Sequence, residues 1–157
     1  MTEEVSSPAS ELEDLLRRLD SAREALMGIL TGCDPEKFSV QTAEGQSIKR
    51  VLERTADDLN FYYGRLVARA VSLPQPPCMQ GADFASLREA IMSLRVAHRR
   101  FANLLHDLVP ADLDRTAADE EHGTHTLRQV LEMATAHYRL RAQQVANTLA
   151  QTPGRSA

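Results

Sequence analysis

The chain has 157 residues, 43% of them hydrophobic and 25% charged, with a formal net charge of −4. This length and composition indicate one globular domain, and no apolar run approaches the ~20 residues that a transmembrane helix needs. A dense cationic surface for nucleic acid is also missing. The first ten residues have neither a basic nor an apolar segment, so we expect no signal peptide and a cytoplasmic location.

The two cysteines, Cys33 and Cys78, fall in different predicted loops and form no metal or redox motif. They could pair with each other, but two free thiols in a reducing compartment are the favoured interpretation.

The first two predicted helices are marked by their caps and apolar spacing. Ser10 and Glu13 form a capping box, leucines follow at helical spacing, and Gly32 stands where a helix would end. Residues 33–46 are predicted to be a loop. The second helix is predicted over 47–71, and the three prolines that follow would stop it.

The stretch 72–82 is too long for a hairpin turn and predicts a crossover, which would let the second and third helices run parallel. The third helix is predicted from Asp83, as N-cap, to Val109 before a proline. An acidic connection then leads to a fourth helix, which would begin at Thr124 or Thr126 and reach about Gln151.

No segment alternates with the period of two that a half-buried strand shows. Four amphipathic helices bury their apolar stripes most simply against one another, so the sequence predicts an all-α four-helix bundle. The predicted limits are a flexible N-terminus over 1–9, a single bundle over 10–152 and a flexible tail over 153–157.

Polar residues interrupt three of the predicted apolar stripes. On the fourth helix His137 and Arg141 lie one turn apart on the core face, and on the third His98 stands within the stripe. On the second helix Arg54 and Asp58 lie at the edge of the stripe, again one turn apart. A buried guanidinium needs an anionic partner, because leaving it unpaired costs several kcal/mol.

Three interpretations of these residues remain open. They could form a structural ion-pair network with hydrogen-bonded core histidines, they could be simply exposed, or they could line a pocket for a small anion. The candidate ligand-binding residues are Arg54, Asp58, Tyr62, His98, His137, Arg141 and Gln144.

Two stretches, 47–59 and 126–144, resemble helices two and four of the DinB-like proteins, which are damage-inducible, thiol-associated helical bundles. The likeness extends over roughly residues 10–150. It implies an up-down-down-up bundle that often forms a homodimer. Phe61 and Tyr63, which we expect to be exposed beside Tyr62, also favour a homodimer.

Many such relatives hold a divalent metal with three histidines and catalyse transferase or isomerase reactions that use mycothiol or bacillithiol. Carried across by the resemblance, the ligand positions fall on Arg54, His137 and Arg141, followed by Gln144. Arginine has no lone pair for a metal, so we expect a degenerate metal site, no cofactor and no metal-dependent catalysis. The expected function is then the binding of a small anionic molecule or of a protein partner. The alternative is an enzyme with Zn or Ni held by a rearranged set that includes His98 and Asp58.

Overall fold

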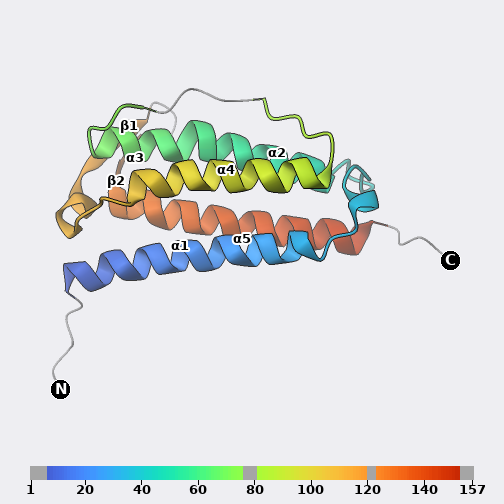
Figure 1. Ribbon diagram of the computed structural model, residues 1–157, viewed down its shortest axis with the longest axis horizontal. Helices are drawn as coiled ribbons and strands as arrows, with labels where there is room; N and C mark the ends of the chain where they lie inside the picture. Colours follow the sequence, from blue (N-terminus) through green and yellow to red (C-terminus); the bar gives the residue numbers. More distant parts are fainter. Residues whose placement is uncertain (1–6, 76–80, 120–122, 153–157) are drawn as a thin grey trace, which may run out of the picture.

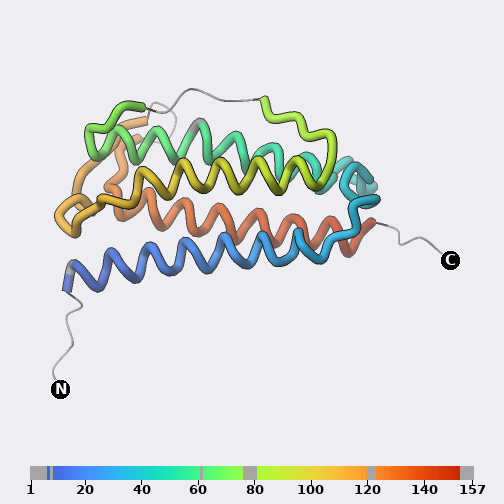
Figure 2. The backbone as a smooth tube through the Cα atoms, in the orientation of Figure 1, coloured from blue at the N-terminus to red at the C-terminus, as the bar shows by residue number. Residues whose placement is uncertain are grey.

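The computed structural model describes residues 7–75, 81–119 and 123–152. It contains a bundle of long helices, α1 (Pro8–Thr31), a second rod made of α2 (Ile48–Asp57), η2 (Asp58–Tyr63) and α3 (Gly64–Ala70), then α4 (Leu87–Leu105) and α5 (Leu127–Gln151) (Figure 1). Followed along the chain in Figure 2, the second rod and α4 run in the same direction, opposite to α1 and α5. The predicted up-down-down-up four-helix bundle is therefore confirmed.

The core lies where the apolar stripes meet. α1 packs most extensively against α5, which also packs on α2, and α2 packs on α4 from its other side. Leucines of α1 and α5 such as Leu19, Leu26 and Leu131 are almost completely buried. The burial of this apolar surface away from water contributes most of the favourable free energy that holds the helices together. None of the described helices is long and apolar enough to cross a membrane.

Helix caps confirm three of the predicted ends and correct two others. Ser47 and Thr126 cap α2 and α5, and Gly32 caps the end of α1. α1, however, is capped by Ser7, whose Oγ accepts from the backbone N–H of Ser10 at 3.3 Å. Ser10 is thus inside the helix, and the predicted flexible N-terminus is wrong from Pro8 onward; residues 1–6 and the tail 153–157 lie outside the described part.

The predicted N-cap Asp83 is also wrong, because Ser86 caps α4 and accepts from Glu89 N–H at 3.2 Å. Asp83 is engaged elsewhere, since its Oδ1 accepts from Lys49 Nζ at 2.5 Å. Lys49 also donates to Glu53 and to the carbonyl of Phe84, both at 2.8 Å, and so fastens the start of α2 to the segment before α4.

The connections contain short elements that the sequence did not predict. 3-10 helices η1 (Pro35–Lys37) and η3 (Pro110–Asp114) interrupt the loops, and α4 ends at Leu105 rather than Val109. Strands β1 (Thr116–Asp119) and β2 (Gly123–Thr126) pair antiparallel, with Ala117 opposite His125. The buried methyl of Ala117 and a bond from Arg69 Nη1 to the Ala118 carbonyl, 3.0 Å, hold this hairpin against α3.

Candidate functional site

The second rod changes its hydrogen-bonding pattern halfway along its length. Between α2 and α3, the segment η2 (Asp58–Tyr63) is π-helical. A π-helical turn has one residue more than an α-helical turn, so it rotates the side chains that follow, and such segments are frequent at functional sites. Asp58, at the start of η2, and Tyr63, at its end, both contact side chains of α5.

Asp58 meets two side chains of α5. Its Oδ2 accepts from Arg141 Nη2 at 2.9 Å and lies 3.7 Å from Nδ1 of His137. Arg141 Nη1 donates to Gln144 Oε1 at 2.8 Å. The side chains of Arg141 and His137 are only 12% and 6% exposed, whereas that of Asp58 is 41% exposed. We call Asp58, His137, Arg141 and Gln144 the Arg141 cluster.

The imidazole of His137 is neutral at neutral pH. Burial lowers its pKa to about 4; the Asp58 carboxylate opposes that shift, whereas the Arg141 charge adds to it. Its Nε2 is buried and has no hydrogen-bond partner among the described residues. The ring lies 5.1 Å from that of Tyr63, whose pKa is raised to about 12 by burial and by Asp58.

Two other candidate residues near η2 do not join the ion pair. Arg54 is exposed, one turn before Asp58, and makes no ion pair within the described part of the chain. Tyr62 is half-buried, with its ring 4.9 Å from that of Tyr63. The expectation that Tyr63 is exposed is wrong, because the ring is 9% exposed and packs on His137; the side chain of Phe61 lies outside the description.

His98 belongs to a different part of the bundle. Its Nδ1 is hydrogen-bonded to the hydroxyl of Tyr138 at 2.8 Å, and its Nε2 lies 3.8 Å from the carboxylate of Asp20 on α1. Burial lowers the pKa of His98 to about 4 and raises that of Tyr138. The Tyr138 ring packs near both imidazoles, with its centroid 5.8 Å from that of His98 and 6.1 Å from that of His137. His98 is thus a hydrogen-bonded core histidine.

The donor atoms of the Arg141 cluster do not fit a divalent metal. Arg141 has no lone pair to give, and the Asp58 oxygen nearest to His137 already accepts from the guanidinium. His137 remains as a single imidazole, which cannot hold Zn or Ni without other ligands. Across the ranges that the structure describes, no three His, Cys, Asp or Glu side chains are grouped to bind a metal ion.

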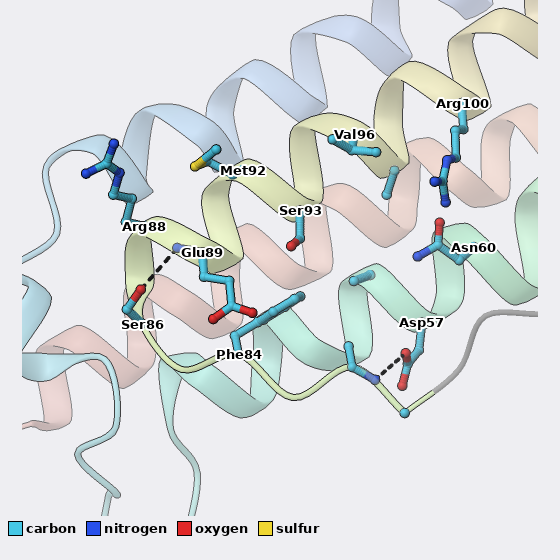
Figure 3. A pocket seen from close by; sticks show the side chains of 14 residues that line it. Asp57, Asn60, Phe84, Ser86, Arg88, Glu89, Met92, Ser93, Val96 and Arg100 are labelled. Atoms are coloured by element: carbon cyan, nitrogen blue, oxygen red, sulfur yellow. Dashed lines mark hydrogen bonds between the residues drawn. The ribbon is translucent and has the colours of Figure 1, made fainter.

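A groove that the sequence did not predict runs along the other side of the second rod, between α2–η2 and α4 (Figure 3). Its volume is about 680 Å³, within the range of small-molecule sites. Met92 and Val96 of α4, four residues apart, border it and are 55% and 50% exposed. Two large apolar side chains on a predicted solvent face were the sequence signal that could have located it.

Comparison with known proteins agrees with the geometry. The family model of the DinB superfamily matches residues 18–145. Among solved structures, the chain is similar to TT2238, described as a four-helix bundle protein, with a TM-score of 0.67 and 21% identity over 87% of this chain and 98% of that one. This likeness shows the fold alone. A search of curated proteins finds no match. On the family match, the chain belongs to the DinB superfamily.

Proposed function

We propose that this chain is a metal-independent binding protein of the DinB superfamily, whose ligand is a small anionic molecule, and that it does not catalyse metal-dependent thiol transfer. The observation that carries the metal-independent part of the proposal is the Asp58–Arg141 ion pair of 2.9 Å. It places a guanidinium, 12% exposed, beside the one histidine kept at the positions where the resemblance implies metal ligands.

A metal-dependent thiol transferase or isomerase would need a metal ion that the Asp58–Arg141 pair cannot replace. In the metal-bearing relatives a dication would lower the pKa of the thiol cofactor. A guanidinium can stabilise a nearby anion but cannot coordinate a sulfur atom, because it has no vacant coordination position. A rearranged ligand set with His98 is not favoured either, since its Nδ1 is hydrogen-bonded to the Tyr138 hydroxyl and its Nε2 faces the carboxylate of Asp20.

Within the Arg141 cluster we assign Asp58 and Arg141 a structural role. Nη1 and Nη2 of Arg141 are engaged by Gln144 and Asp58, so the guanidinium closes the space between η2 and α5. A ligand is therefore expected elsewhere on the bundle. Homodimer formation and a cytoplasmic location, in line with the unpaired, buried thiol of Cys33, remain parts of the proposal.

A gain-of-function variant gives the sharpest test. Arg141→His places a second imidazole one turn after His137 and frees the carboxylate of Asp58, so it should create a Zn²⁺ site. The matched control is Arg139→His, which adds a histidine on the exposed face of the same helix. Isothermal titration with Zn²⁺ should show stoichiometric binding for Arg141→His and none for wild type or Arg139→His. Stoichiometric binding by wild type that is lost in His137→Ala would contradict the proposal.

A further inference from the structure

A second hollow lies between the end of α1 and the start of α4, at the end of the bundle where Figure 1 shows both helices beside the connection 33–46. α1 packs most extensively on α5, and this leaves space beside α4. The volume is about 690 Å³, within the range of small-molecule sites. We call this space the α1–α4 hollow. Ser86, Arg88 and Met92 border both it and the groove of Figure 3, and its other lining residues do not line that groove.

The walls of the α1–α4 hollow are apolar and fixed in place. Leu30, Phe38 and Leu87 are buried, at 1%, 3% and 5% exposure, and Ile91 is partly buried against the core. The connection that carries Phe38 is fastened to α2, because the Phe38 carbonyl accepts from the backbone N–H of Lys49 at 2.9 Å. A ligand with an apolar body therefore meets a surface that is already formed, which lowers the entropy cost of binding.

Three charged side chains line the α1–α4 hollow, and two of them are positive. Arg88 and Arg95 come from α4, and Glu36 comes from η1. Neither arginine makes a hydrogen bond or an ion pair with any residue in the ranges that the structure describes, whereas Glu36 has an interaction of its own. The hollow thus has an excess of positive charge in a chain whose net charge is −4, and both guanidinium groups can donate to a ligand.

The two arginines stand at opposite ends of one apolar strip. They are seven residues apart in α4, which places their Cα atoms about 10 Å apart along the helix axis. Ile91 and Met92 lie one turn after Arg88 on the same face, between the two guanidinium groups. In Figure 3 the Arg88 side chain extends away from the groove that Phe84 borders. A molecule that fits this strip has an apolar body and a carboxylate at each end, because guanidinium groups bind carboxylates in a bidentate manner.

Both parts of such a ligand are needed for binding. Arg88 and Arg95 are exposed, so water screens their charge and an ion pair with either one contributes little by itself. Met92 is 55% exposed, and covering it removes apolar surface from water. The apolar contact and the two ion pairs therefore act together.

We propose that the α1–α4 hollow binds an elongated organic dianion, with its apolar body along Ile91 and Met92 and one carboxylate at each of Arg88 and Arg95. The proposal rests on the binding function proposed above and names its ligand class. The two proposals fail on different results. Stoichiometric Zn²⁺ in wild-type protein would contradict metal independence and leave this site standing, whereas a lack of dianion binding would overturn this site alone.

Titration calorimetry with decanedioate tests the proposal, because an apolar chain of similar span separates its two carboxylates. Wild type should bind one decanedioate, and should bind decanoate, which has a single carboxylate, about tenfold more weakly, which corresponds to about 1.4 kcal/mol. Decanediamine, which has the same chain and the opposite charge, should show no binding. Equal affinities for decanedioate and decanoate would overturn the proposal of a dianion, as would binding of decanediamine.

Charge variants test the two arginines. Arg88→Gln and Arg95→Gln should each weaken decanedioate binding about tenfold, to the affinity of decanoate. The matched control is Arg99→Gln, which removes the same charge from an exposed position of α4 that lines neither the hollow nor the groove, and it should change the affinity by less than about twofold. Equal weakening by Arg95→Gln and Arg99→Gln would overturn the proposal.

A pair of filling variants shows where the ligand lies. Ser39→Trp fills the α1–α4 hollow from an exposed position, so decanedioate binding should be lost while the melting temperature is retained. Ser93→Trp fills the groove of Figure 3 in the same way and should leave binding unchanged. Binding that survives a folded Ser39→Trp, or that is lost only in Ser93→Trp, would contradict the assignment to the hollow.

Discussion

Asp58→Asn removes one charge from the pair that joins η2 to α5. Breaking a fully buried pair costs about 3–5 kcal/mol, and breaking an exposed one about 0–1. Arg141 is 12% exposed but Asp58 is 41% exposed, so water partly replaces the lost carboxylate charge. We therefore expect a loss of about 2 kcal/mol in the free energy of unfolding, or a melting temperature lower by roughly 4–8 °C for a chain of this length.

Urea unfolding monitored by circular dichroism measures this loss. Asp14→Asn is the matched control, because Asp14 is 39% exposed and pairs with Arg17 and Arg18, which are themselves 78% and 48% exposed. It should cost less than about 0.5 kcal/mol. In an Arg141→Gln background, Asp58→Asn should lose most of its effect. Equal losses for Asp58→Asn and Asp14→Asn would refute the argument that burial of the arginine decides the energy.

Three further predictions concern the core. His98 and His137 have pKa values of about 4, below the ~6.5 of an unfolded histidine, so between these pH values the unfolded chain binds more protons than the folded one. The free energy of unfolding, measured with urea, should therefore fall as the pH is lowered from 6.5 to 4. A stability that does not change over this range would contradict both assignments. Tyr138→Phe removes the hydroxyl that bonds His98 and should lower stability by about 1 kcal/mol, an effect that calorimetry would detect and an unchanged melting temperature would exclude. Leu131→Ala, at a fully buried position, should lower the free energy of unfolding by about 2–5 kcal/mol, and its control Leu140→Ala, at 53% exposure, should change it little. Similar denaturation midpoints for the two variants would show that the packing is misassigned.

The helices could be predicted because their signals are local. Apolar spacing fixed the four stripes, and Ser47 and Thr126 were recognisable as caps because a hydroxyl oxygen there accepts a free backbone N–H. The start of α4 was mistaken because both Asp83 and Ser86 are good caps. The choice depends on Lys49, which engages Asp83 from another helix, and sequence spacing does not contain such a contact.

The hairpin and the π-helical segment were missed for a related reason. The strands have four residues each, and contacts with other parts of the fold hold them in place, such as the hydrogen bond from Arg69 to the Ala118 carbonyl. Asp58, at the start of η2, pairs with Arg141, whereas Arg54, one turn earlier, is exposed. Of the ion-pair network that the sequence predicted for Arg54, Asp58 and Arg141, the pair of Asp58 and Arg141 is therefore present, and Arg54 does not take part in it.

The groove was not predicted, because Met92 and Val96 are on the face of α4 that a bundle helix normally leaves to solvent, where two exposed apolar side chains are a weak signal. Its shape depends on the segment before α4, where Ala82 is bonded to Asp57 and Ala85 to Glu89. Both hydrogen bonds depend on how the segment before α4 packs in the folded chain, so the shape of the groove could not be predicted from sequence spacing.

We propose that the Asp58–Arg141 pair takes the place of the metal that the resemblance implies beside His137. Elemental analysis of wild-type protein, purified without chelator and incubated with Zn²⁺ and Ni²⁺ before desalting, tests it most directly. We predict a metal content far below one ion per chain, with Arg141→His retaining close to one Zn²⁺ under the same treatment. One retained ion per wild-type chain, lost in His137→Ala, would contradict the account.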